Sequence, residues 1–397
     1  MADKTALAES SQALFCAIAD YIGSAKTNRL FDTEKYPDYV EFRKALGAGA
    51  YKTALKRVIT PGVGPTLIDK FLNENNDWYK SSVLIGKKLL NSITEIDSDY
   101  KIKAPGFQKL FYFRGDQEVM GNIEGLFKIA NKSPVKGQAK FGNVNKWSPA
   151  DIYLASEKAK KIIKKTLSTA KPGMFSFVEL NIMTSDMIDT GDLLPLSLKK
   201  TTKDVILQKV NFDKKEEIKM LKKISISPKR VTDWKPYKKV KYGQKAETRD
   251  MRVFLNNKGE IKFRHDPSAK RFVAEFIGSG AEARAGSIGS MKVFCELFRF
   301  VDKNTASKLL KAYNAGEVDY FKLLKKIEFL RSDKKRFDFE RGAISAVTII
   351  NKIMPILKPW FKRTKPKDVE QINDFIRIMY QYITSRTPLS GKFVIAK

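Results

Sequence analysis

Histidine and cysteine are nearly absent from this sequence, in which His265 is the only histidine and Cys16 and Cys295 are the only cysteines. A single histidine excludes metal centres built on several imidazoles and disfavours a Ser-His-Asp hydrolase mechanism. Both cysteines lie in apolar stretches, which predicts buried thiols in a reducing compartment. Chemistry in this chain is therefore expected to rely on carboxylates, lysines and a hard cation such as Mg²⁺ or Mn²⁺.

Acidic residues are scarce relative to basic ones. The 397 residues include 75 Lys or Arg against 44 Asp or Glu, a net charge of +31. Such an excess predicts nucleic acid as the partner, most simply DNA, with RNA left open. The sequence has no apolar run of about twenty residues and no basic-then-apolar N-terminus, so we expect no membrane span and no signal peptide. Attraction to an anionic membrane surface is the alternative explanation of the charge.

Two short patches place polar groups inside apolar, strand-like sequence. Residues 146–154 read Lys-Trp-Ser-Pro-Ala-Asp-Ile-Tyr-Leu, and residues 191–200 read Gly-Asp-Leu-Leu-Pro-Leu-Ser-Leu-Lys-Lys. Ser197 and Lys199 are two positions apart, so they project from the same face of a strand. A carboxylate such as Asp151 on a neighbouring strand could hold a divalent cation, while the ammonium steadies charge on a phosphodiester. Alternatively, the aspartate caps a turn and the lysine only brings its strand to solvent.

In their order and spacing, these patches resemble the PD-(D/E)xK superfamily of restriction endonucleases and Holliday-junction resolvases, and restriction-enzyme-like phage proteins. The resemblance covers roughly residues 105–300. It implies that Asp151 and the Leu198 carbonyl hold Mg²⁺ or Mn²⁺ and that Lys199 orients the attacking water. The chain departs from the family pattern at Ser197, where the family has an acid, and a hydroxyl is a weak ligand for a hard cation.

A second acid is therefore needed if the site is active. Asp116 is expected to cap a helix running from Gln117 to about Ala130. In the family that the patches resemble, a helix before the first catalytic strand often gives an acid to the metal. The resemblance thus suggests Glu124, or Glu118, as the second metal ligand.

Residues 60–72 read Thr-Pro-Gly-Val-Gly-Pro-Thr-Leu-Ile-Asp-Lys-Phe-Leu and resemble the helix-hairpin-helix element of DNA repair proteins. Gly62 and Gly64 would let the backbone approach a phosphate, and amides near Thr66 at the start of the next helix would donate to it. We expect residues 61–66 to hold this phosphate away from the cut. An ordinary helical hairpin is the alternative interpretation.

The most basic part of the chain, residues 199–245, interleaves lysines with Trp234, Tyr237 and Tyr242. This pattern favours a groove that tracks a nucleic-acid backbone and stacks unpaired bases on the rings, with a solvated basic loop as the alternative. The residues expected to contact nucleic acid, besides the glycine turn, are Lys146, Lys200, Trp234, Lys238, Lys239 and, in a glycine-rich loop, Arg284.

Periodicity predicts helices before residue 102 and after residue 303, with strands between them. A hairpin is expected at 251–255 and 261–264, another strand at 271–277 and a closing strand at 390–396. The predicted class is α+β or α/β, with a restriction-endonuclease-like mixed sheet core at 103–302 flanked by helical regions at 1–102 and 303–397. We expect a metal-dependent DNA nuclease of phage type. The alternative is a non-catalytic nucleic-acid-binding or virion structural protein. Either protein is expected in the cytoplasm of an infected host cell or in the virion. It could form a homo-oligomer or bind virion partners.

Overall fold

The computed structural model describes residues 3–93, 110–133, 140–232, 234–244, 250–256, 259–268, 271–278 and 286–397. The expected α+β class is confirmed, because helices accompany two separate sheets. The chain forms two compact units, the first from Met1–Lys136, Asn143–Asp213 and Pro388–Lys397, and the second from Gly137–Gly142 and Lys214–Thr387. These boundaries differ from the three consecutive segments expected. In the described part of the chain, no helix is long and apolar enough to cross a bilayer.

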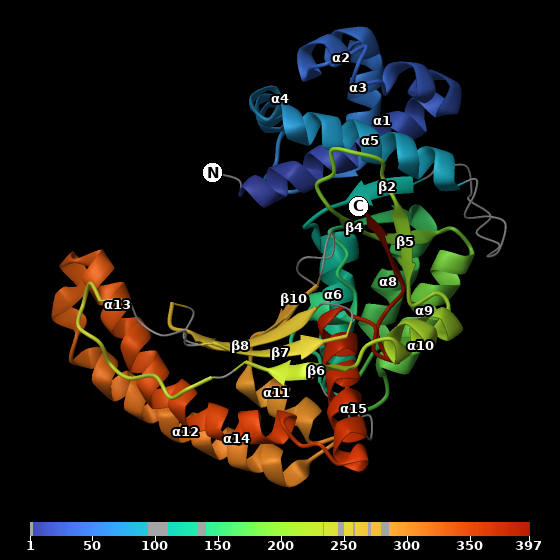
Figure 1. The fold of residues 1–397 in the computed structure, drawn as a ribbon. Helices are drawn as coiled ribbons and strands as arrows, with labels where there is room; N and C mark the ends of the chain where they lie inside the picture. The colour runs from blue at the N-terminus through green and yellow to red at the C-terminus, as the bar shows by residue number, and fades with distance from the viewer. Residues whose placement is uncertain are drawn as a thin grey trace. The chain divides into compact units, whose positions relative to one another are not determined.

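The first unit combines the N-terminal helices with a mixed sheet (Figure 1). Its helical segments are α1 (Lys4–Leu30), α2 (Tyr39–Leu46), α3 (Ala48–Leu55), α4 (Pro65–Glu74), α5 (Asn76–Ile93), η3 (Gln117–Gly121), α6 (Asn122–Ala130), α7 (Val144–Trp147), α8 (Glu157–Thr169) and α9 (Phe177–Asp189). Its strands are β1 (Val58–Ile59), β2 (Leu110–Phe113), β3 (Ile152–Ser156), β4 (Leu193–Leu198), β5 (Leu207–Val210) and β11 (Phe393–Ala396).

The six described strands of this sheet are ordered β1-β2-β3-β4-β11-β5. Strand β3 runs antiparallel to both of its neighbours, β2 and β4, whereas β11 runs parallel to β4 and β1 runs parallel to β2. Every residue of β3 and β4 is buried, which explains their continuous apolar sequence: a central strand covered on both faces has no solvent side. The expected closing strand is confirmed as β11, whose Ile395 lies opposite Ser197.

Local capping sets the ends of the helices around this sheet. The Ser156 hydroxyl accepts from the Ala159 amide and begins α8 directly after β3. Asp116 accepts from two amides, as its expected capping role requires, and starts η3, which continues into α6. Ser176 and Glu179 form a reciprocal capping box at α9. Such caps satisfy amides that have no partner inside the helix.

The second unit contains an antiparallel sheet with helices on one face (Figure 1). Its strands are β6 (Ile226–Val231), β7 (Met251–Leu255), β8 (Glu260–Asp266), β9 (Arg271–Ile277) and β10 (Gly286–Ile288), paired in chain order. Its helical segments are α10 (Lys214–Lys222), α11 (Met291–Phe298), α12 (Lys303–Lys325), η5 (Glu328–Ser332), α13 (Lys334–Ser345), η6 (Ala346–Ile350), α14 (Asn351–Phe361) and α15 (Pro366–Ile383). The expected hairpin and third strand are confirmed as β7, β8 and β9.

One face of this second sheet is apolar and the other is polar. In β8, Ile261, Phe263 and His265 are buried, and the residues between them are partly exposed. Phe263 packs against Phe294 of α11 with 5.8 Å between the ring centroids. This alternation is typical of an antiparallel sheet that packs on helices with one side only.

Candidate functional site

The pairing of β3 with β4 brings the two sequence patches together at one end of these central strands of the first unit. Strand β3 pairs with β4 so that Ile152 lies opposite Leu196, which places Asp151 beside the end of β4. The Asp151 amide donates to the Leu196 carbonyl at 2.9 Å. Just before it, the buried Trp147 donates its indole N–H to the Asn181 side chain at 2.9 Å. The buried ring and the strand pairing therefore fix Asp151 at the entrance of β3.

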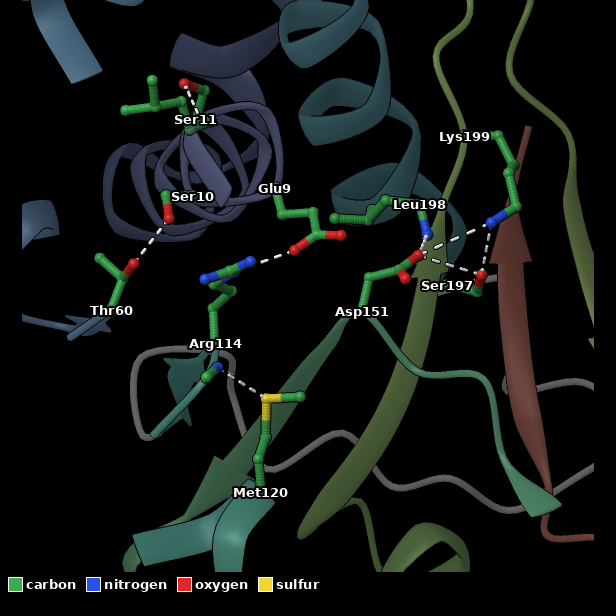
Figure 2. Close-up of polar contacts among 12 residues, drawn as sticks. Glu9, Ser10, Ser11, Thr60, Arg114, Met120, Asp151, Ser197, Leu198 and Lys199 are labelled. Carbon is green, nitrogen blue, oxygen red and sulfur yellow. Dashed lines mark hydrogen bonds and ion pairs between the residues drawn. The ribbon is translucent and has the colours of Figure 1, made fainter. Parts of the chain in front are cut away.

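The Asp151 carboxylate faces three donors from the end of β4 (Figure 2). Its Oδ2 accepts from the Leu198 amide at 2.6 Å and from the Ser197 hydroxyl at 3.1 Å, and the Lys199 Nζ lies 3.7 Å away. Lys199 also donates to the Ser197 Oγ at 3.0 Å, so these two residues share a face, as the strand period predicts. The Lys199 side chain is 55% exposed, which leaves its ammonium open to a ligand beside the carboxylate.

A second carboxylate comes from α1. Figure 2 shows Glu9 between Arg114 and Asp151, and the Arg114 Nε donates to the Glu9 Oε2 at 2.9 Å. Burial raises the pKa of Glu9 above its ordinary value, and the nearby negative charge of Asp151 raises it further, while the Arg114 hydrogen bond and the charges of Arg114 and Lys199 act in the opposite direction. The two acids and the two cations are therefore close enough to influence one another's charge at this end of the strands.

The sequence holds one signal for Glu9, which the sequence reasoning missed. Glu9 begins the polar string Glu-Ser-Ser-Gln, which lies next to an apolar stretch of the helix, and Ser10, Ser11 and Gln12 are fully buried or nearly so. Polar residues on a buried stretch of helix need partners, and Ser10 finds one in the Thr60 hydroxyl at 2.6 Å.

The acids expected on the helix after β2 lie elsewhere. Glu124 forms an ion pair with Lys128 one turn along α6 at 2.8 Å, and its side chain is 48% exposed. Glu118 pairs with Lys160 at 3.2 Å. Both acids thus pair with lysines on helices of the same unit, and the expectation that one of them binds a metal stays a prediction.

The donor set fits a cation that keeps most of its water. Asp151 Oδ1 and Glu9 Oε1 form no hydrogen bond in the described part of the chain, so each acid has a free oxygen. Within that same part, no group of three or more acidic, histidine or cysteine side chains converges on one point. Mg²⁺ commonly binds through one or two carboxylates plus substrate phosphates, whereas an all-protein Ca²⁺ or Zn²⁺ cage needs more ligands. The pair therefore suits Mg²⁺ or Mn²⁺ in the presence of a phosphate ligand.

The glycine turn lies at the same end of the strands as Asp151. Strand β1 pairs in parallel with β2, and the Arg114 amide donates to the Ile59 carbonyl at 2.9 Å, so Thr60 leaves the sheet beside Arg114. Gly62 adopts a positive φ of 77°, and neither it nor Gly64 has any atom near the position of a Cβ. One strand separates β1 from β3, a spacing of roughly 10 Å. The turn and Asp151 thus lie at the same end of the strands, and the expected grip on a phosphate away from the cut stays a prediction.

A short strand and the glycine turn join the two helices of the segment expected to be a helix-hairpin-helix element. Strand β1 lies between α3 and α4. The Tyr51 hydroxyl of α3 donates to the Asp69 carboxylate of α4 at 2.7 Å and links the two helices. Thr66 is exposed in the first turn of α4, where its amide can face solvent.

The lysines that flank the two patches differ in their surroundings. Lys146 is partly buried, and this burial lowers its pKa to about 8. Lys200 is exposed, forms an ion pair with Asp77 and lies 5.3 Å from the centre of the Trp78 ring. Lys200 is therefore accessible to phosphate at the end of β4, whereas Lys146 is the more enclosed of the two.

The basic segment of the second unit differs from its expected groove. Trp234 is 4% exposed and Tyr237 is 3% exposed, so both rings fill the interior and are closed to nucleobases. Lys238 is exposed, and Lys239 pairs with Glu340 at 3.1 Å. Tyr242 is the exposed ring of this segment. Arg284, expected in the glycine-rich loop, lies outside the described residues.

Comparisons of the chain with protein-family models, curated proteins and solved structures give no match.

Proposed function

We propose that the first unit is a metal-dependent nucleic-acid phosphodiesterase with a restriction-endonuclease-like core. The observation on which this depends is that Glu9 of α1 lies close enough to Asp151, just before β3, to be influenced by its charge, beside the exposed ammonium of Lys199. The mixed order β2-β3-β4-β11, antiparallel except for its last pair, supports such a core. A Mg²⁺ or Mn²⁺ ion on the two acids would activate water and polarise the phosphodiester.

Each side chain of the site has a role that its contacts support. Ser197 donates to Asp151 and accepts from Lys199, so it orients both. Lys199 would stabilise the negative charge that develops on the phosphate, since its ammonium is held next to the site and faces solvent. Arg114 holds Glu9 and leaves one carboxylate oxygen for a cation. The acid absent from position 197 is thus replaced by one from a helix.

Nucleic acid fits this site as the substrate for three reasons. The chain carries a net charge of +31, which favours binding to a polyanion. The open turn at Gly62 and Gly64 lies at the same edge and would let the backbone contact a neighbouring phosphate. Lys200 lies next to Lys199 and supplies a further cation near the strand end.

A cleavage assay tests the proposal. Plasmid and labelled single-stranded DNA are incubated with Mg²⁺ or Mn²⁺ and compared among the parent, Asp151→Asn, Glu9→Gln and Lys199→Met. We expect the parent and the control Glu124→Gln to cleave and the three site variants to lose at least a hundredfold in rate, as loss of transition-state contacts typically costs about 10²–10³. Equal cleavage by the parent and Asp151→Asn would show a contaminant and remove the assignment.

A non-catalytic nucleic-acid-binding protein is the second candidate, and one observation favours it. Asp151 Oδ2 faces three donors from β4, a pattern that would also serve to lock two strands together. In that case the parent binds DNA without cleaving it in either metal, and Asp151→Ala mainly lowers stability because it leaves the Leu198 amide without its acceptor.

A further inference from the structure

A polar pocket in the second unit has the composition of a nucleotide site. It lies where α11 ends and α12 begins, has a volume of about 580 Å³ and opens to solvent. That volume is within the usual range for small-molecule sites, about 300–1,000 Å³. Residues Arg299, Phe300, Lys303 and Asn304 line one part of it, and Arg363 lines another.

The side chains at the pocket mouth are available to a ligand. Those of Arg299, Lys303 and Asn304 form no hydrogen bond or ion pair within the described ranges. Phe300 is 46% exposed, an unusual position for a large aromatic ring in a polar hollow. Two cations, an amide and an open ring are the groups that contact phosphate, a base edge and a base face.

The opposite wall is fixed by internal contacts. The Arg363 guanidinium lies 4.6 Å from the centre of the Trp360 ring and donates to the Gln371 side chain at 2.9 Å. Asp302, the one acid among the lining residues, accepts from both the amide and the hydroxyl of Thr305 and from the Trp360 indole. Its oxygens are thus already hydrogen-bonded, and the pocket keeps an excess of positive charge because three cations and one acid line it.

We propose that this pocket, here called the α11–α12 pocket, holds one nucleotide of single-stranded DNA. The base stacks on Phe300, and the flanking phosphates contact Arg299 and Lys303. A single strand is specified because the bases of a duplex are already stacked and leave no face for the ring. The inference rests on the proposed function for its ligand class, nucleic acid, and adds the strand type and a binding residue.

The test measures binding in EDTA, so that cleavage plays no part. The dissociation constant of the full chain for a labelled oligo-dT is measured over a series of NaCl concentrations. Phe300→Leu should weaken binding about tenfold without changing the salt dependence, since it removes a stack and no charge. Arg299→Ala should flatten the slope of log K against log salt by about 0.7, the value for one phosphate contact on a single strand.

Matched controls come from the same unit. Phe329→Leu changes another exposed phenylalanine, 77% exposed in η5, and Lys311→Ala removes an exposed charge from α12, away from the pocket lining. Phe329→Leu should leave affinity unchanged, Lys311→Ala should leave it within about twofold, and Phe300→Tyr should retain parent affinity. All variants are checked for an unchanged melting temperature.

Three results would overturn the inference. The first is equal affinity of Phe300→Leu and Phe329→Leu for oligo-dT. The second is competition by free dTMP as effective as that by the oligonucleotide, which would make the pocket a mononucleotide site. The third is tighter, Phe300-dependent binding of oligo-rU, which would assign it to RNA. Phe300-dependent binding without any cleavage in Mn²⁺ would refute only the proposed activity, whereas cleavage without Phe300 dependence would refute only this pocket.

Discussion

The pairing of Glu9 with Asp151 predicts that a divalent cation stabilises the first unit against heat. Burial and the Asp151 charge raise the pKa of Glu9, so the folded chain binds this proton more tightly than the unfolded chain. The stability contributed by Glu9 therefore falls as pH rises above its ordinary value of 4.5 and through the raised folded value. A cation between the carboxylates would reverse this loss, because it binds the charged acids and not the protonated ones.

The size of the effect follows from mass action. At a metal concentration of about ten times the dissociation constant, a ligand specific to the folded state adds about 1.4 kcal/mol. In a domain of roughly 150–250 residues, each kcal/mol raises the melting temperature by about 2–4 °C, so a shift of about 3–6 °C is expected. The shift should shrink as pH falls toward 4.5, where protons compete for Glu9.

Thermal melts with 0–10 mM MnCl₂ at several pH values measure this shift, and no catalytic turnover is needed. Asp151→Asn and Glu9→Gln should each abolish it. Glu124→Gln should keep it, because Glu124 is paired with Lys128 on α6. A full shift in both Asp151→Asn and Glu9→Gln would place the cation elsewhere. A shift lost only in Glu124→Gln would restore the acid that the sequence suggested.

Three further predictions concern single residues. Lys199→Met should change unfolding free energy by less than about 1 kcal/mol, since its ion pair with Asp151 is solvent-exposed, while lowering cleavage strongly; an equal loss of stability in urea titrations would make Lys199 structural. Trp234→Ala should destabilise the second unit by about 3–5 kcal/mol in urea, whereas Trp234→Phe should leave DNA affinity unchanged, because the ring is buried. Burial lowers the pKa of His265 to about 4, so its stabilising contribution is complete above about pH 6.5 and is lost as pH falls from there through pH 4. As the only histidine, it can be followed by proton NMR, and a midpoint near 6.5 would contradict its burial.

The strands of the site could be predicted because their sequence is locally decisive. A continuous apolar run interrupted by a single Asp or by Ser-Leu-Lys indicates a buried strand with a polar end, and β3 and β4 lie where those runs occur. Alternation at Ile261 and Phe263 likewise predicts β8 with one face on a core. Local periodicity does not report the order of strands, so it gave no sign that the last residues insert between β4 and β5.

Whether an aromatic ring is exposed or buried was the least predictable feature of the basic segment. The pattern of lysines around Trp234 and Tyr237 is the same for a stacking groove and for a segment whose rings are anchored inward. In the structure, residues far away in the sequence hold the segment so that the rings point inward. The Asn351 side chain accepts a hydrogen bond from the Tyr237 amide at 2.8 Å, and Lys358 donates to the Trp234 carbonyl at 2.6 Å. Phe300, by contrast, is exposed although it follows an apolar helix.

The serine at position 197 and the glutamate at position 9 have a common electrostatic explanation. An acid at position 197 would lie within hydrogen-bonding distance of Asp151, where the serine hydroxyl now lies at 3.1 Å. Glu9 and Asp151 already place two negative charges beside the two cations, Lys199 and Arg114. A third carboxylate would repel both acids and would leave the negative charges in excess of the positive ones. The serine keeps the hydrogen bond that orients Asp151 and leaves two acids facing two cations. A serine at position 197 is therefore compatible with the proposed two-carboxylate site, because a second acid reaches the same end of the strands from α1.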